Sequence, residues 1–426
     1  MTTTTTTTTT KATVLIVGAG IAGPTLGLQL LSHPELAARF RPLLIDRIAL
    51  PPSPDAFAAT ATAPAAPTAA ATATAAATAA TAATAATAAT APNATPPAAP
   101  IAAPTATPSP PATASVEPPP ASGGAGVVLG GNSLHILAGL GLKEAFWAAS
   151  EETLANDIWR AHDGAQPPAA RLLNRLVSPA YMTDLDSGLR GVERARLQSL
   201  LVHAYLARGG EARWACKLAG LKQTPAGACA LLAGGERIAA DLVVGADGVW
   251  SAVRRAVLLG DDADQWKPQF EYVSVLFGIA EAPDTAAGPG PDAGRGHVVL
   301  TADGVCSTWP LPDGRQMVGV HILENAEPAS GSSGGGSWVR LRQDGHDLAL
   351  ATGGYSAESS LAILKHHEAV WHPVAGSFGA LFRRVSRLHR LALWQHVWAP
   401  HQIVRAGNVA LVGDASRCMN PAAGQG

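Results

Sequence analysis

A glycine pattern near the start of the chain is the strongest constraint on its fold. Residues 18–23 spell G-x-G-x-x-G, directly after the β-branched apolar run TVLIV at 13–17 and before a periodic apolar segment at 26–31. This order predicts a strand, a tight turn and a helix. A second apolar run, residues 42–45, ends at Asp46. Together these segments predict a βαβ unit that can bind a dinucleotide.

Each glycine of the motif has its own role in such a turn. Gly18 permits the sharp bend, Gly20 lets the backbone approach a pyrophosphate, and Gly23 lets the helix pack closely on the strand. The helix N-terminus attracts the negative charge of the phosphates. Asp46 is placed to accept hydrogen bonds from an adenosine ribose. A glycine turn that packs tightly without a ligand has the same pattern, so the motif alone leaves both interpretations open.

Two later segments repeat the plan of an apolar strand that runs into a turn containing glycine and aspartate. Residues 242–248 read LVVGADG, and residues 409–415 read VALVGDA. Shortly after the second of these, residues 421–426 read PAAGQG. Taken alone, an Asp-Gly pair is an ordinary turn.

In this order and spacing, the three segments resemble the fingerprints of the class A flavin monooxygenases, which have the p-hydroxybenzoate hydroxylase fold. The resemblance covers residues 13–47, 123–147, 190–260 and 403–426. It implies an FAD-dependent hydroxylase that uses NAD(P)H and O2 on an aromatic or related small molecule. In such enzymes the reduced flavin captures O2 as a C4a-hydroperoxide, so no catalytic side chain is predicted. The resemblance is weak in the sheet domain, where this family binds substrates.

The resemblance also implies which residues contact the cofactor. The motif at 18–23 is similar to the adenosine and pyrophosphate site, Asp247 to the family's DG motif, and Asp414 to the GD aspartate that bonds the ribityl chain. Arg194 matches an arginine that reaches the cofactor, although a solvated helix charge would look the same. Residues 424–426 resemble the turn at the pyrimidine edge of the flavin. The predicted cofactor-binding residues are Gly18, Gly20, Ile21, Ala22, Gly23, Asp46, Arg47, Arg194, Asp247, Gly248, Gly413, Asp414, Pro421, Gly424, Gln425 and Gly426.

The parallel segments are separated by a strand-rich block with a hairpin turn at 313–314, and a helical region is expected at about 356–390. This arrangement predicts an α/β fold with a discontinuous Rossmann-like FAD-binding domain in three layers. A second, mostly antiparallel sheet forms the substrate domain. The predicted boundaries are 1–12 for a disordered tail; 13–50, 123–150, 188–262 and 400–426 for the FAD-binding domain; 51–122 for a low-complexity Ala/Thr/Pro insertion; and 151–187 with 263–399 for the substrate domain.

Composition excludes several other classes of protein. The net charge is -2 and the basic residues are scattered, which argues against binding to nucleic acid or an anionic membrane. No apolar stretch approaches the ~20 residues of a membrane span, and the four cysteines show no CxxC spacing. A soluble, cytoplasmic protein is therefore expected. No metal site is predicted, because Trp371 stands where the second histidine of an H-E-x-x-H motif would follow His367 and Glu368.

Three departures from the family pattern leave alternatives open. Arg417 stands where many relatives have histidine, and the low-complexity insertion replaces a short connection. Relatives continue beyond the Gly-Gln-Gly turn, whereas this sequence ends at Gly426, so weak FAD binding is expected. The alternatives are a non-catalytic truncated FAD-binding remnant, or another flavin oxidoreductase of the same fold, such as a reductase or halogenase. The absence of a W-x-W-x-I-P sequence weakens the halogenase alternative.

Overall fold

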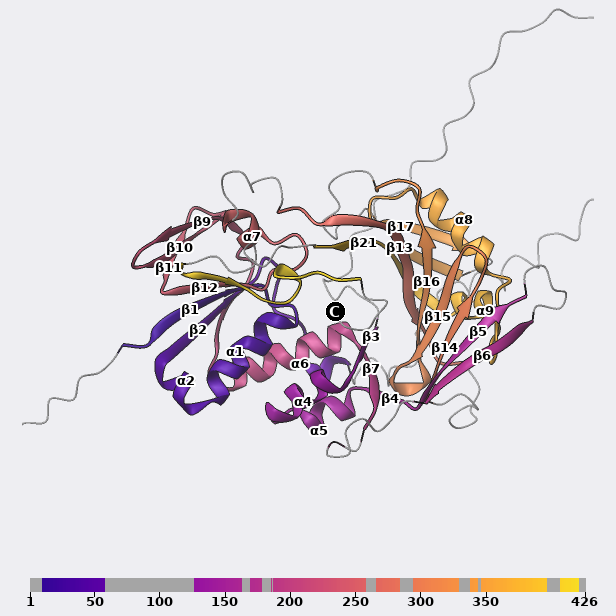
Figure 1. The fold of residues 1–426 in the computed structure, drawn as a ribbon, viewed down its shortest axis with the longest axis horizontal. Helices are drawn as coiled ribbons and strands as arrows, with labels where there is room; N and C mark the ends of the chain where they lie inside the picture. The colour runs from indigo at the N-terminus through magenta and orange to yellow at the C-terminus, as the bar shows by residue number, and fades with distance from the viewer. Residues whose placement is uncertain are drawn as a thin grey trace, which may run out of the picture. The chain divides into compact units, whose positions relative to one another are not determined.

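The computed structural model describes ten parts of the chain (Figure 1). They are residues 10–57, 126–162, 169–177, 185, 187–257, 266–283, 294–328, 338–343, 346–396 and 407–420. The described residues within 1–54 and 114–426 form one compact unit. Most of the predicted insertion and the predicted contacts at 421–426 lie outside the described residues.

A five-stranded parallel sheet carries the predicted motifs. Its order is β22-β12-β1-β2-β8. The strands are β1 (Ala12–Val17), β2 (Phe40–Ile45), β8 (Glu211–Arg213), β12 (Leu242–Gly245) and β22 (Val409–Leu411). The buried parts of the inner strands, such as residues 14–17 of β1 and 43–45 of β2, are apolar because both faces of the sheet are covered, as in other parallel sheets. The three sequence motifs therefore follow the carboxyl ends of three adjacent strands, β1, β12 and β22.

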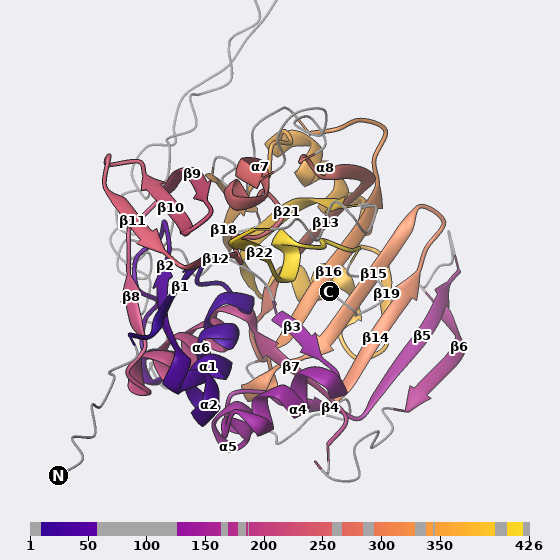
Figure 2. The same cartoon turned by 60° about the vertical axis from the view of Figure 1, so that its left-hand side comes forward.

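Helices cover one face of this sheet (Figure 2). They are α1 (Ala22–Ser32), α2 (Pro34–Arg39), α4 (Gly131–Gly139), α5 (Lys143–Ala148) and α6 (Arg194–Ala207). Helices α1 and α6 meet where Gly27 faces Tyr205, so closely that a Cβ at Gly27 would lie 2.6 Å from the tyrosine ring. The Tyr205 hydroxyl lies 2.9 Å from the Pro42 carbonyl oxygen and 2.8 Å from that of Glu211. This contact holds α6 against two strands of the sheet.

Two three-stranded antiparallel sheets flank the parallel one. The first, in the order β3-β7-β4, leads into α6, and the second, β11-β10-β9, packs its apolar side on the other face of the parallel sheet. Their strands are β3 (Gly126–Leu129), β4 (Glu151–Thr153), β7 (Leu189–Glu193), β9 (Leu218–Thr224), β10 (Gly227–Leu232) and β11 (Arg237–Ala240). Helix α7 (Ala252–Val257) follows β12. The parallel sheet thus lies between two layers, which confirms the predicted three-layer α/β arrangement.

A nine-stranded sheet forms the rest of the unit, in the order β17-β18-β21-β13-β16-β15-β14-β5-β6. It is antiparallel except for the pairs β14–β5 and β18–β21, so the predicted second sheet is confirmed. The strands are β5 (Ala155–Ala161), β6 (Ala170–Val177), β13 (Gln269–Ala280), β14 (Arg295–Leu300), β15 (Gly304–Pro310), β16 (Gln316–Leu323), β17 (Trp338–Gln343), β18 (His346–Ala351) and β21 (Val385–Gln395). Helices α8 (Ala357–His367) and α9 (Phe378–Phe382) cover one of its faces.

The hairpin between β15 and β16 turns where predicted, since Asp313 and Gly314 have φ values of 65° and 71°. The predicted helical region at 356–390 was wrong in two places. In its middle, β19 (Trp371–His372) and β20 (Gly376–Ser377) form a short antiparallel pair. Residues from Val385 onward form β21, which pairs with the long central strand β13. Buried Val385, Leu388 and Arg390 point to the α8 side, and tertiary pairing with β13 decides the strand conformation over local propensity. Among the described residues, none of the helices is long and apolar enough to span a membrane.

Candidate cofactor site

The glycine turn after β1 packs directly on the turn after β12. Gly18 has a φ of 110°, and a Cβ there would lie 2.4 Å from the carbonyl oxygen of Ala246. A Cβ at Gly23 would lie 1.9 Å from the carbonyl oxygen of Gly18. Neither position has room for a side chain. These two glycines therefore shape the turn itself and hold it against the DG segment.

Gly20 differs from Gly18 and Gly23 because a side chain at this position would point into open space. Among the described residues, apart from its chain neighbours, the only atom within 4 Å of a Cβ there is Nη2 of Arg194, 3.7 Å away. Arg194 is the first residue of α6, which begins directly after β7. The structure thus brings the predicted arginine to the glycine turn, although the two are far apart in sequence. An open glycine beside a guanidinium is a suitable place for a phosphate.

Asp46 orients the glycine turn. Its Oδ2 accepts a hydrogen bond from the backbone N–H of Ala19 at 2.5 Å, and its Oδ1 accepts one from Ile48 at 2.9 Å. A carboxylate has about four acceptor positions, so these two bonds leave capacity for a ribose hydroxyl. Arg47, the next residue, is exposed.

Gln198 is a site residue that the sequence analysis missed. Its side chain is buried, and its Nε2 donates to the carbonyl oxygen of Ala19 at 2.7 Å. Gln198 follows Arg194 by one helical turn, so both residues face the glycine turn from α6. The four-residue spacing from Arg194 could have identified Gln198, because it places both side chains on the same face of the predicted helix.

Asp247 of the DG segment caps helix α7. Its carboxylate accepts hydrogen bonds from the Ser251 hydroxyl at 2.5 Å and from the backbone N–H groups of Ala252 and Val253 at 2.7 and 3.2 Å. An aspartate in this position satisfies amides that the first turn of a helix leaves unpaired. Gly248 has a φ of 82°, which favours glycine. The described contacts of Asp247 are therefore structural.

The GD turn packs on the other side of the same glycine motif. Gly413 has a φ of 58°, and a Cβ there would lie 2.8 Å from Cβ of Ala22, in the first turn of α1. Asp414 follows, with an accessible side chain that accepts no hydrogen bond among the described residues. Protein atoms around its carboxyl raise the pKa of Asp414 by desolvation, and the positive charges of Arg194 and Arg254 oppose this rise. Asp414 thus lies near the arginine that borders Gly20.

Arg254 joins the DG and GD segments. Its side chain is buried, and its Nε donates to the carbonyl oxygen of Ala415 at 2.9 Å, while Nη2 donates to that of Asp414 at 2.9 Å. Nη1 lies 2.5 Å from Nε2 of His396, at the end of the nine-stranded sheet. Burial lowers the pKa of Arg254 to about 10, so the side chain stays charged at neutral pH. The sequence analysis assigned Arg254 no role.

Cys418 and Arg417 also lie close to the GD turn in sequence. Burial raises the pKa of Cys418 to about 12, and its thiol donates to the Trp394 carbonyl, which agrees with an unreactive cysteine. Arg417 is exposed. The predicted contacts at Pro421, Gly424, Gln425 and Gly426 lie outside the described residues.

The assembled site fits the parts of a dinucleotide cofactor. The glycine turn at 18–23 has an open backbone at Gly20 and the N-terminus of α1 for a pyrophosphate. Arg194 adds positive charge at that position. Asp46 and Asp414 offer carboxylate acceptors on either side of the turn, near the ends of β2 and β22. These features match the requirements of FAD.

Comparison with known proteins agrees with this geometry. Residues 120–304 match a family model described as an FAD binding domain. A salicylate hydroxylase of Pseudomonas putida is 26% identical over 305 residues, which cover 68% of this chain and 67% of the relative. A second salicylate hydroxylase of Pseudomonas putida is 25% identical over 327 residues, covering 73% of this chain and 66% of the relative.

Solved structures share the fold. Klebsiella pneumoniae HpxO complexed with FAD and uric acid superposes with a TM-score of 0.59 at 16% identity, over 97% of this chain and 76% of that protein. A salicylate hydroxylase substrate complex superposes with a TM-score of 0.58 at 17% identity, over 98% of this chain and 76% of that protein.

Proposed function

The chain belongs to the class A FAD-dependent monooxygenases, and we propose that it hydroxylates a small aromatic molecule with NAD(P)H and O2 as co-substrates. Both salicylate hydroxylases that it resembles are named for an aromatic substrate. The four cysteines are all free thiols, which supports an intracellular setting for the enzyme.

One observation carries the proposal of the cofactor site. Segments from four distant parts of the sequence meet at the glycine turn: Gly18 contacts Ala246, Gly20 borders Arg194, and Gly413 contacts Ala22. A turn that served only packing would have no reason to keep Gly20 open. We therefore assign the pyrophosphate of FAD to Gly20 and the N-terminus of α1, with Arg194 as its positively charged partner.

When bound and reduced, FAD supplies the activation of O2 that hydroxylation requires. The protein's own residues position the cofactor. Asp46 holds the glycine turn through Ala19 and has acceptor capacity for the adenosine ribose. Asp414 offers a carboxylate without a protein partner among the described residues, suited to a ribityl hydroxyl. Arg254 holds the GD turn in place by hydrogen bonds to the carbonyl oxygens of that turn.

The nine-stranded sheet offers a face for an aromatic substrate. Leu276, Cys306 and Val320 pack in the core with α8 and α9, so residues that alternate with them point to the opposite face. Those residues include Phe277, Ser307, Trp309, Gly319 and His321. Phe277 and Trp309 are partly exposed and can stack on a ring. Burial lowers the pKa of His321, so its imidazole is neutral at pH 7 and can bond a phenolic hydroxyl.

Contacts between the nine-stranded sheet and the start of α6 support a substrate site on this face, next to the cofactor site. Glu193, the residue before Arg194, forms an ion pair with Arg315 in the β15–β16 turn, with 2.5 Å between Oε1 and Nη1. A Cβ at Gly126 would lie 3.3 Å from the sulfur of Met317 on β16. The start of α6 is therefore anchored to the strands that carry the proposed substrate face.

The proposal is tested by loading the purified chain with FAD and measuring NADH and NADPH oxidation with a panel of aromatic acids, salicylate included. We expect at least one compound to accelerate oxidation and to yield a hydroxylated product. Peroxide is measured in parallel, because a compound that only stimulates reduction releases H2O2 instead of product. FAD binding with no product from any aromatic compound would favour another flavin oxidoreductase of this fold.

A matched pair of variants separates the substrate face from the cofactor site. His321→Gln should raise KM for the accepted substrate and leave FAD binding unchanged. Tyr272→Phe serves as the control, because Tyr272 is exposed on β13. Equal kinetics for wild type and His321→Gln would remove this residue from the proposed substrate face.

A further inference from the structure

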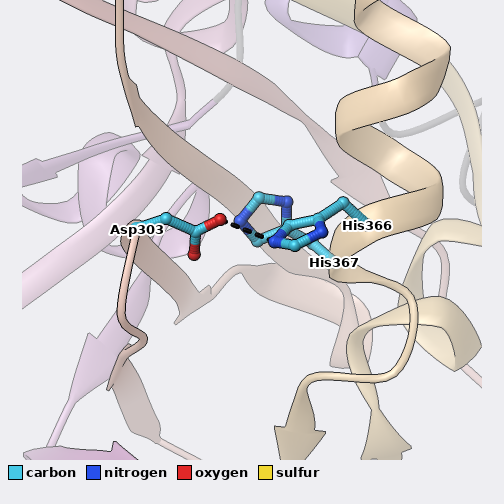
Figure 3. Close-up of side chains that lie close together, drawn as sticks. All are labelled: Asp303, His366 and His367. Atoms are coloured by element: carbon cyan, nitrogen blue, oxygen red, sulfur yellow. Dashed lines mark ion pairs between the residues drawn. The ribbon is translucent and has the colours of Figure 1, made fainter. Parts of the chain in front are cut away.

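Three potential metal ligands lie together away from the proposed cofactor site (Figure 3). Asp303 lies in the turn between β14 and β15, and His366 and His367 end helix α8. One donor atom from each residue lies within 4.8 Å of the other two. The figure shows both imidazole rings reaching from α8 toward the Asp303 carboxylate. The cluster therefore joins a hairpin turn to the C-terminus of a helix.

His367 is the decisive member because its free nitrogen is buried. The residue is 3% exposed, and its Nδ1 lies 2.8 Å from the carbonyl oxygen of Ile363. A carbonyl oxygen can only accept, so Nδ1 carries the proton and Nε2 holds a lone pair. Nε2 has no hydrogen-bond partner among the described residues. It faces the turn that contains Asp303, since a Cβ on Gly304 would lie 3.9 Å from it.

The other two side chains are held ready beside this nitrogen. Nε2 of His366 lies 2.6 Å from Oδ2 of Asp303. The other carboxylate oxygen, Oδ1, accepts a hydrogen bond from the Thr301 hydroxyl at 3.1 Å. Ile363 and Thr301 thus orient two of the three ligands, which is the usual arrangement of groups around a metal-binding histidine or carboxylate. Both Asp303 and His366 are more than half exposed, so an ion can reach them from solvent.

We propose that Asp303, His366 and His367 bind one divalent transition-metal ion of the zinc class. Two imidazole nitrogens and one carboxylate oxygen form a ligand set that Zn²⁺ accepts, whereas Mg²⁺ and Ca²⁺ prefer oxygen ligands alone. The partial negative charge at the C-terminus of α8 favours a cation at this position. Three protein ligands leave a fourth position of the tetrahedron for water.

A simple ion pair between Asp303 and His366 explains two of these side chains. It does not explain why the lone pair of His367 is buried and faces the same turn with no donor among the described residues. A bound ion uses all three donors and fixes the β14–β15 turn to α8. The site lies on the face of the nine-stranded sheet that α8 covers, so we expect it to stabilise this part of the fold without any role in flavin chemistry.

The test uses the full chain with its affinity tag removed, because a histidine tag itself binds zinc. The protein is dialysed against a chelator and titrated with ZnCl2 by calorimetry, and its Tm is recorded with and without zinc. We expect one equivalent of zinc to bind and the Tm to rise, with no effect of MgCl2 at the same concentration. Absence of zinc binding to the wild-type chain would overturn the proposal.

Exposed ligands provide variants that should fold normally. Asp303→Asn and His366→Gln should each weaken zinc binding at least about tenfold, since even the loss of a group that orients a ligand costs 10–100-fold. His367→Gln should do the same, but its burial could also disturb packing. His33→Gln is the control, because His33 is exposed on a different helix end. Zinc binding that Asp303→Asn and His366→Gln leave unchanged would place the ion elsewhere and refute this site.

Discussion

Arg254 and Ala415 are 161 positions apart in sequence, yet the buried guanidinium donates twice to the Ala415 carbonyl oxygen, from Nε at 2.9 Å and from Nη2 at 2.5 Å. The same side chain reaches the Asp414 carbonyl and His396. A planar fork with five N–H donors can satisfy several acceptors at once, which a lysine cannot do. Arg254 therefore links the DG helix, the GD turn and the end of the nine-stranded sheet.

Replacing Arg254 by Met should destabilise the fold and weaken FAD binding together. The loss leaves buried carbonyl oxygens without donors, at a cost of at least about 2 kcal/mol in the free energy of unfolding. Arg254→Lys should recover only part of the loss. Denaturant unfolding and FAD titration measure the two effects. Arg255→Met is the control, because Arg255 is the next residue and is exposed. Similar losses in both variants would show that Arg254 has no special role.

Gly20 and Gly23 should respond to alanine in opposite ways. A Cβ at Gly20 meets only the end of the Arg194 side chain, so Gly20→Ala should keep the wild-type Tm and raise the Kd for FAD about tenfold or more by obstructing the phosphate. A Cβ at Gly23 would overlap the Gly18 carbonyl oxygen, so Gly23→Ala should lower the Tm. Thermal unfolding without FAD, followed by flavin titration, distinguishes the two. Unchanged FAD affinity in Gly20→Ala would remove Gly20 from the site.

Asp414→Asn should reduce FAD affinity without changing the stability of the unliganded protein. The carboxylate accepts no hydrogen bond from the described residues, so the substitution breaks none of their bonds, whereas a bound ribityl hydroxyl would lose its partner. A charge-assisted hydrogen bond is worth about 1.5 to 3 kcal/mol, which predicts a rise in Kd of roughly 10- to 150-fold. Fluorescence quenching of FAD on titration gives the Kd. A drop in the Tm of the unliganded variant would point to a structural role instead.

Stability should fall in mild acid because of His396. Burial, and then the positive charge of Arg254, lower the pKa of His396 to about 3 in the folded chain, whereas an unfolded histidine titrates near 6.5. Between these values the unfolded state binds the extra proton, so the free energy of unfolding decreases as pH falls through this window. The slope is at most about 1.4 kcal/mol per pH unit for this group.

Denaturant midpoints measured from pH 7 to pH 4 test this expectation. His396→Gln should flatten the decrease, because glutamine can still accept from Arg254 and does not titrate. The exposed His33→Gln serves as the control and should keep the wild-type slope. If His396→Gln and wild type lose stability in parallel, another group controls the acid response.

Local sequence patterns were enough to predict the framework of the cofactor site. The βαβ unit around residues 18–23 is encoded within about thirty neighbouring residues, by a β-branched run, a glycine turn and helical periodicity. The hairpin turn at Asp313 was readable for the same reason. The two later motifs were recognised because each is again an apolar strand that runs into a turn containing glycine and aspartate. Their meeting at one place was implied only by family resemblance.

Other features depended on contacts between distant segments, which periodicity does not record. Residues 385–390 have a composition compatible with a helix, and pairing with β13 makes them a strand. In the sequence, Arg254 resembles any charged residue of a helix, and only the structure shows its bonds to the carbonyl oxygens of the GD turn. Gln198 is likewise identified only by its hydrogen bond to Ala19. The sequence by itself determined the strands, glycine turn and helix of the βαβ unit and the hairpin turn at Asp313, because their signals are local. The tertiary structure decided which polar side chains are buried and which groups they form hydrogen bonds with, because burial depends on the packing of the whole chain.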